Sequence, residues 1–422
     1  MSILNDAKLT LIPSGYKSTK VYSVKPTNGD GDFTFARTGE ATRINPGGNI
    51  ETVATNVPRI DHFGGGCPSL LLEDASTNRQ VNSEKLDNAD WQKQADLTVV
   101  ANQIISPSGE LTADKIQRGS TINTNNYIGD AVNKSSAAQL DIAISVFVKQ
   151  GEGDFFAMRA QGGYSTGRVD FIYQFSTNTI TANAPGTDAT LLSTKSESYG
   201  NGWIRLSFVF NSDANAANST FFSPRATSGN IDSSDTSSTA FVYVWGCQVE
   251  ENSFSTSYIP TTTTLATRNA ETCDASGNSN IFNDSEGVLY AEISALADDG
   301  TVRAICISNG TAGDAITIRY SVLLNLIRVE IKDGNVQQFF FQTTSYNFLQ
   351  FVKLAVKYKA NDCKVYINGV QVATDTSVTI PSGLNTLNFD SGSGNQNFYG
   401  KCKDLRYYDT SLTDAELTEL TT

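Results

Sequence analysis

Acidic side chains near the C-terminus are the first residues whose spacing could support chemistry. Asp414, Glu416 and Glu419 are spaced much like paired catalytic acids, and glycoside hydrolysis needs two carboxylates roughly 5–10 Å apart across a cleft. Thr413-x-x-Glu416 is also typical of a capping box that opens a short helix. Carboxylates in a first helical turn interact favourably with the positive end of the helix dipole, so a structural role is preferred over catalysis.

Other catalytic chemistry finds little support. With His62 as the single histidine, neither a Ser-His-Asp or Cys-His pair nor a multi-histidine metal site is plausible. No phosphate-binding loop or dinucleotide fingerprint occurs. The sequence therefore predicts a protein that is not an enzyme. The cysteines form no C-x-x-C pair, and we expect reduced, mostly buried thiols at Cys67, Cys247, Cys273, Cys306, Cys363 and Cys402.

Two oxygen-rich clusters raise calcium as an alternative. Asn28-Gly-Asp30-Gly-Asp32 and Asn361-Asp362 carry suitable ligands, but neither has the spacing of an EF-hand loop. Clusters of Asn, Asp and Gly usually form turns, which is the favoured interpretation. We expect no cofactor and no dedicated metal site, with calcium left open.

Aromatic residues in polar loops are the candidates for sugar binding. A ring face matches the C–H face of a pyranose, and flanking amides bind its hydroxyls. Tyr127 and Tyr164 lie in Asn/Gly/Ser/Thr-rich loops, and Trp91 is a further, ambiguous candidate. Trp203 and Trp245 lie in strand-like stretches, where packing in the core is favoured.

Three arginines in the first 80 residues form a second candidate site, with acids nearby in the sequence: Arg37, Arg43 and Arg59, beside Glu40, Glu51 and Asp61. Structural salt bridges are the default interpretation, because bidentate pairs fix extended segments that have little apolar area. A surface that attaches the chain to a larger assembly is the alternative.

Composition limits the class of protein. Hydrophobic residues make up 39% and charged residues 18% of the chain, which predicts a globular protein. The formal charge of −13 argues against nucleic acid as a partner. Apolar runs stop far short of the ~20 residues that cross a bilayer, so no membrane insertion is expected. The start of the chain lacks the pattern of a secretory signal, and we expect synthesis in the cytoplasm.

Short alternating apolar runs, broken by turn residues, predict antiparallel strands along most of the chain. The Asn368-Gly369 pair within 364–373 predicts a hairpin with a type I′ turn. Residues 353–358 alternate apolar and polar side chains, which predicts a strand with one buried and one wet face.

Composition shifts at 258–264 and 274–280 mark a boundary between domains. Glycine and proline clusters suggest that the first 80 or so residues are rich in loops. We therefore expect an all-β protein with a loop-rich segment over 1–80 and two antiparallel β-sandwich domains over 81–265 and 275–422, the second of which ends in a short helix.

Three groups of motifs together resemble phage tail-fibre and minor virion proteins. Residues 32–45, Val57-Pro-Arg59-Ile-Asp61, 67–73 and Thr77-Asn78 look like the segment that often precedes carbohydrate-binding-like modules in such proteins. Residues 82–84 and Trp91 through Val244-Trp-Gly-Cys-Gln-Val-Glu250 to 254–260 and 266–268 are similar to jelly rolls of carbohydrate-binding families. Residues 287–420, with the Tyr366-Ile-Asn-Gly hairpin, the strand at 398–409 and the final helix, resemble a concanavalin A-like or laminin G-like sandwich.

The resemblance implies a virion structural protein, made in the host cytoplasm, that belongs to a tail or head fibre. Such a component would bind host-surface polysaccharide or protein. The fibre architecture also implies other virion proteins as partners and a homotrimer. An architectural capsid decoration or connector protein that binds only virion proteins is the alternative. A polysaccharide depolymerase is a weaker one.

Overall fold

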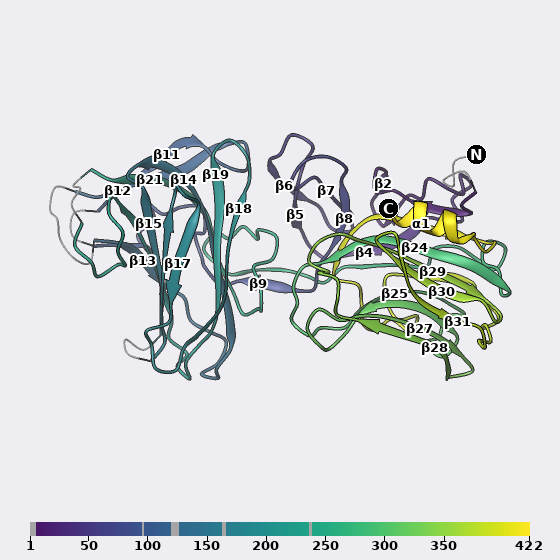
Figure 1. Ribbon diagram of the computed structural model, residues 1–422. Helices are drawn as coiled ribbons and strands as arrows, with labels where there is room; N and C mark the ends of the chain where they lie inside the picture. The colour runs from purple at the N-terminus through teal and green to yellow at the C-terminus, as the bar shows by residue number, and fades with distance from the viewer. Residues whose placement is uncertain (1–5, 95–96, 120–125, 163–165, 236–238) are drawn as a thin grey trace. The chain divides into compact units, whose positions relative to one another are not determined.

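The computed structural model describes residues 6–94, 97–119, 126–162, 166–235 and 239–422 (Figure 1). Over these residues it consists of antiparallel strands and a single helix, α1 (Asp414–Thr421). The predicted all-β class with a short C-terminal helix is therefore confirmed. None of the helical structure described is long and apolar enough to cross a membrane.

The chain divides into two compact units. Unit 1 comprises Met1–Glu40, Val53–Asp74 and Asn269–Thr422, and unit 2 comprises Ala41–Thr52 and Ala75–Arg268. Each unit encloses a hydrophobic core of its own.

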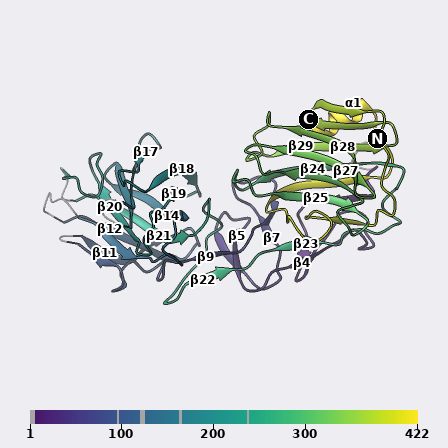
Figure 2. The same ribbon diagram turned by 90° about the horizontal axis from the view of Figure 1, so that it is seen from below.

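Unit 1 is a two-layer sandwich of antiparallel strands, and the axes of its long strands are nearly aligned (Figure 2). One sheet has the order β31 (Val370–Asp375), β30 (Cys363–Ile367), β29 (Val352–Lys359), β24 (Glu286–Ala295), β33 (Gly400–Tyr408), β8 (Ser69–Leu72) and β7 (Arg59–Asp61), and β1 (Leu9–Leu11) also pairs with β33. The other has the order β28 (Val336–Thr343), β27 (Ile327–Asp333), β26 (Ala315–Tyr320), β25 (Arg303–Ser308) and β32 (Thr386–Asn388). A small sheet adds β2 (Tyr16–Lys17), β3 (Lys20–Val21), β4 (Phe33–Ala36) and β23 (Thr272–Asp274).

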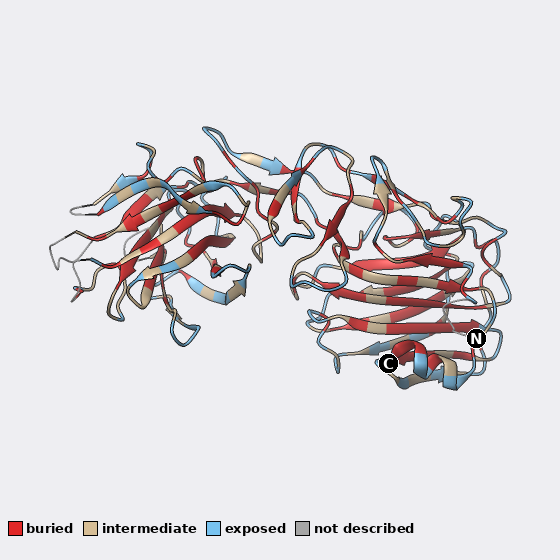
Figure 3. Ribbon diagram, turned by 90° about the horizontal axis from the view of Figure 1, so that it is seen from above, coloured by how far each residue is buried: buried red, intermediate tan, exposed pale blue. Residues whose placement is uncertain are grey.

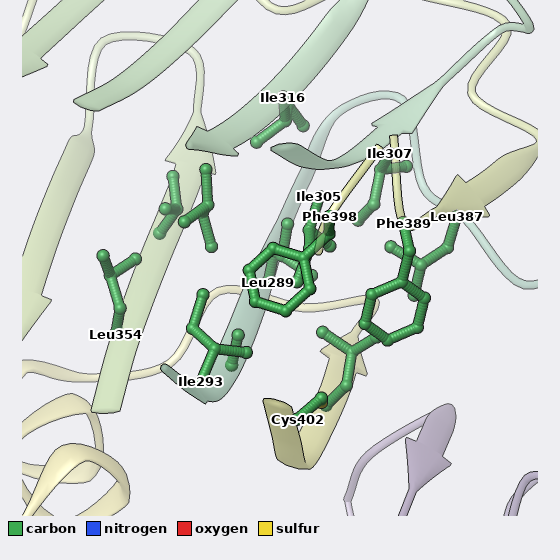
Figure 4. Packing of buried hydrophobic residues seen from close by; sticks show 14 of the residues in the cluster. Leu289, Ile293, Ile305, Ile307, Ile316, Leu354, Leu387, Phe389, Phe398 and Cys402 are labelled. Atoms are coloured by element: carbon green, nitrogen blue, oxygen red, sulfur yellow. The ribbon is translucent and has the colours of Figure 1, made fainter. Parts of the chain in front are cut away.

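Apolar side chains from both large sheets fill the space between them. Leu289 and Ile293 of β24 lie with Ile305 of β25, and the rings of Phe389 and Phe398 close the same cluster (Figure 4). All five are buried, which accounts for the mostly buried long strands of this unit (Figure 3).

The N-terminal residues do not form a separate segment in these contacts. Leu70 of β8 pairs with Cys402 of β33, and Leu11 of β1 pairs with Leu405 of the same strand. Leu9, Leu11 and Leu70 lie in the core cluster of unit 1. The dense turns of residues 1–80 predict a separate segment. Strands β1, β7 and β8 instead join a sheet whose other strands come from the C-terminal part of the chain.

The hairpin predicted at Asn368-Gly369 is confirmed. The two residues join β30 to β31 with φ of 49° and 82°, the positive values that a type I′ turn requires.

The wet face predicted for residues 353–358 is wrong. Ala355 and Lys357 of β29 are buried together with the alternate residues Leu354 and Val356. Helix α1 packs on this outer face and places Leu417 among Ala355 and other apolar residues. A strand pattern alone cannot show that a distant helix covers its second face.

Unit 2 contains two six-stranded antiparallel sheets. One has the order β11 (Thr98–Ile105), β12 (Leu111–Gln117), β21 (Phe241–Glu250), β14 (Asp141–Glu152), β19 (Trp203–Asn211) and β18 (Thr190–Ser198). The other has the order β10 (Gln92–Lys93), β13 (Ile128–Ala131), β20 (Ser219–Arg225), β15 (Phe155–Gln161), β16 (Arg168–Gln174) and β17 (Thr179–Asn183). Two short pairs, β9 (Ser76–Asn78) with β22 (Ala266–Arg268) and β5 (Ala41–Ile44) with β6 (Ile50–Val53), complete the strands.

The thiols follow the sequence expectation. All six cysteines are free, and five of them are buried, whereas Cys67 is exposed.

Candidate functional site

The structure does not bring the predicted sugar-binding aromatics together. Tyr127 is half-buried, with its ring edge-on to Phe221 at a centroid distance of 4.9 Å. Tyr164 lies outside the described residues. Trp91 is 1% exposed, and its Nε1–H donates to the Asn82 carbonyl at 3.2 Å. The prediction that Trp91 faces a ligand is wrong, because its ring packs in the core of unit 2.

The arginine set is mainly structural. Arg37 and Arg59 are fully buried, and both bind the carboxylate of Glu271, with N–O distances of 2.7 and 2.8 Å. Arg59 also binds Glu73 at 2.6 Å. Burial alone would lower the pKa of Arg59, but Glu271 and Glu73 outweigh burial and raise that pKa. Neither side chain is available for attachment to a particle, so this part of the prediction is wrong and the salt-bridge interpretation holds.

Arg43 differs from the other two because its pair is partly exposed. Its Nε lies 2.7 Å from Oε1 of Glu51, one of the acids expected beside it. The pair joins β5 to β6 within one hairpin and leaves the acid 35% exposed. Arg43 is a structural pair on a hairpin surface.

The acids that suggested hydrolysis have structural partners. Glu416 and Thr413 form the predicted capping box of α1, and Lys364 binds Asp414 at 2.7 Å. Among the oxygen-rich clusters, the Asn28 side chain accepts a hydrogen bond from the Asp30 amide, as in a turn. Asp362 pairs with Lys357 at 2.6 Å. Within the described ranges, no group of three or more His, Cys, Asp and Glu residues could hold a metal ion.

A cavity of about 590 Å³ lies on unit 2. Its wall includes the turn between β18 and β19. Tyr199 and Trp203 close this turn with backbone bonds of 2.9 Å, Tyr199 N–H to the Trp203 carbonyl and Trp203 N–H to the Gly200 carbonyl. Gly200, Asn201 and Gly202 all have positive φ, which explains the Gly-Asn-Gly sequence between the two aromatic residues.

Two other segments complete the cavity. The β11–β12 turn contributes Gln103, Ile105 and Leu111, and the tip of the β5–β6 hairpin contributes Asn49. The Ile50 amide donates to the Pro107 carbonyl at 2.8 Å, which fixes the hairpin tip beside this turn.

The cavity combines aromatic, apolar and amide groups. Tyr199 is half-buried and meets Phe147 edge-on at 4.8 Å, while Trp203 is 2% exposed and donates from Nε1 to the Ile105 carbonyl at 3.1 Å. Asn49, Gln103 and Asn201 add amide groups. Lys149, which pairs with Trp203 across β14 and β19, is the one charged side chain among the described lining residues. Such a wall suits an uncharged, hydroxyl-rich ligand with one apolar face.

The sequence pattern does not predict this cavity, for two reasons. Trp203 was expected in the core, which is confirmed by its burial, but one residue can also form part of a cavity wall. The one feature of the local sequence that could indicate a binding site here is the pair of aromatic residues that flank Gly200-Asn-Gly202. Asn49 is more difficult to find, because only the fold brings it beside Pro107.

One family model matches the C-terminal part of the chain. Residues 278–418 match the family model described as Concanavalin A-like lectin/glucanases superfamily. The resemblance of this region to a concanavalin A-like sandwich is therefore confirmed. No curated protein matches the chain.

Several solved structures share a limited likeness. The CBM40 of the Ruminococcus gnavus IT-sialidase, bound to α2,3-sialyllactose, is 14% identical, with a TM-score of 0.30 over 35% of this chain and 94% of that one. Domain 4 of AbnA, a GH43 arabinanase of Geobacillus stearothermophilus, in complex with arabinotriose, is 14% identical, with a TM-score of 0.29 over 36% and 73%. TM-scores this low do not define a shared fold or ligand.

Proposed function

We propose that this chain is a non-enzymatic structural protein of a phage particle, a tail- or head-fibre component made in the host cytoplasm, and that it binds host-surface glycan. The concanavalin A-like sandwich supports a lectin-like role, since such folds commonly present surfaces for recognition, although a fold alone does not fix a ligand. The observation that carries the proposal is the cavity of unit 2, whose wall contains Tyr199 together with the amide side chains of Gln103 and Asn201. Other virion proteins are the further partners, and the assembly is a homotrimer.

Glycan-array binding tests this function. Tyr199→Ala removes the half-buried ring, and we expect it to weaken glycan binding about tenfold, since aromatic contacts contribute ~0.5–1.5 kcal/mol beyond area burial. Gln103→Ala removes one amide from an exposed strand position and should weaken binding less. Tyr127→Ala is the control at the other loop aromatic. Absence of glycan binding, or binding that only Tyr127→Ala reduces, contradicts the assignment to this cavity.

A specific surface favours the alternative, an architectural decoration or connector protein. Val322, Leu323 and Leu324 at the β26–β27 turn are 61–68% exposed, and consecutive exposed apolar residues are typical of protein contacts. Light scattering would distinguish a trimer from a monomer. Stable incorporation into particles without glycan binding would favour this alternative. Release of reducing sugar from host capsule would instead favour a depolymerase.

A further inference from the structure

A second cavity, of about 380 Å³, lies on unit 1 and has a different chemistry. Its floor is the outer face of the sheet formed by β25–β28 and β32, where Arg319 of β26 and Glu330 and Lys332 of β27 point away from the core. Their neighbours Ile318 and Ile331 are buried in the core, as strand alternation requires. A loop contributes the hydroxyls and amides of the rim, from Ser391, Ser393, Asn395 and Gln396.

Positive charge exceeds negative charge on this floor. Glu330 pairs with Arg319 and lies 3.6 Å from Lys332, so one carboxylate serves two cations. Arg328 lies directly opposite Arg319 in the β26–β27 register and adds a third cation. The charged lining residues Arg319, Lys332 and Glu330 therefore carry a net charge of about +1, and Arg328 beside them raises it to about +2, in a chain whose total charge is −13.

Burial makes this excess costly. The Arg319 side chain is 15% exposed and that of Glu330 is 9% exposed. The Nε atoms of Arg319 and Arg328 are buried, and neither has a hydrogen-bond partner among the residues that the structure describes. Burial and the charge of Arg328 lower the pKa of Arg319 although Glu330 opposes them, which is the response expected of an under-compensated guanidinium.

We propose that this cavity binds an oxyanion, the carboxylate, sulfate or phosphate group of a ligand, between Arg319 and Lys332. A bound anion would offset the excess charge, and the planar guanidinium is suited to such groups. Ser391, Ser393 and Asn395 would donate to the remaining polar atoms of the ligand. The assignment does not depend on the uncharged cavity of unit 2, because it rests on different residues in the other unit.

Calorimetric titration with four probes tests the site: glucuronate, inorganic sulfate, inorganic phosphate and glucose. We expect at least one anion to bind and glucose not to bind at this site. The strongest of the three anions identifies the source of the oxyanion. Affinity should fall as salt rises, because a charge-based contact is screened.

Lys332→Gln is the main variant, because its side chain is 34% exposed and the change should not disturb folding. We expect it to weaken anion binding about tenfold, the usual worth of one charge-assisted hydrogen bond. Lys359→Gln removes one lysine charge from a side chain that is 46% exposed and lies outside the cavity, and it should leave binding unchanged.

Tyr199→Ala should also leave anion binding unchanged, which separates this site from the proposed glycan site. Failure of all three anions to bind, or equal loss in Lys332→Gln and Lys359→Gln, would overturn the oxyanion site. Either result would leave the glycan-binding proposal intact.

Discussion

Glu271 is the residue on which the buried charges of unit 1 depend. It accepts hydrogen bonds from Arg37, from Arg59 and from the Glu73 amide, the last at 3.0 Å. Glu271→Gln would leave two buried guanidinium groups under-compensated, and we expect a loss of ~3–5 kcal/mol in the free energy of unfolding. Chemical denaturation followed by far-UV circular dichroism measures it. Glu51→Gln, at the partly exposed Arg43 pair, is the control and should cost less than about 1 kcal/mol. Equal losses in both variants would contradict this view.

Asp274 gives unit 1 a pH-dependent stability. Burial and the neighbouring charge of Asp390 raise the pKa of Asp274 to about 7, and within the described part of the chain its Oδ1 has no hydrogen-bond partner. The unfolded chain releases this proton near pH 4, whereas the folded chain holds it until about pH 7. The free energy of unfolding should therefore fall as pH rises from about 4 to about 7 and then level off.

Asp274→Asn removes the charge that becomes costly at high pH. We expect this variant to lose that decline and to be more stable than the original chain at pH 8, by at most ~4 kcal/mol. Denaturation midpoints at several pH values measure the effect, and Asp30→Asn at an exposed turn serves as the control. An unchanged pH profile in Asp274→Asn would exclude this residue as the cause.

Helix α1 is an element whose contribution comes from the face it covers. Leu417 is fully buried among Ala355, Tyr366 and Tyr408, on the outer side of the sheet. Leu417→Ala should lower the free energy of unfolding by ~2–5 kcal/mol, because it leaves a cavity where helix and sheet meet. Glu419→Ala changes an exposed position of the same helix and should stay within about 0.5 kcal/mol. Similar effects of the two changes would show that the helix does not act as a cover.

Elements could be predicted from the sequence where their determinants are local. The Asn368-Gly369 turn and the Thr413 capping box depend on residues within a few positions of each other in the chain, and both are confirmed. The outer face of β29 and the hairpin tip at Asn49 depend on partners far along the chain, which alternation does not reveal. Charge pairs are only partly predictable. The sequence predicts a structural salt bridge for Arg59, but it does not identify the main partner, Glu271, which lies far along the chain.

At the scale of the whole molecule, the distribution of tryptophan makes the two units distinguishable. All three tryptophans, Trp91, Trp203 and Trp245, belong to unit 2, and each is at most 2% exposed. Tryptophan fluorescence therefore reports on the unfolding of unit 2, whereas far-UV circular dichroism reports on the strands of both units.

Since the units have separate hydrophobic cores, a change in one core should not alter the stability of the other. Leu417→Ala, in unit 1, should shift part of the circular-dichroism transition to lower denaturant and leave the fluorescence midpoint in place. Val146→Ala, at a fully buried position of unit 2, is the matched variant and should shift the fluorescence midpoint. A fluorescence midpoint that moves equally in both variants would mean that the chain unfolds as one cooperative body.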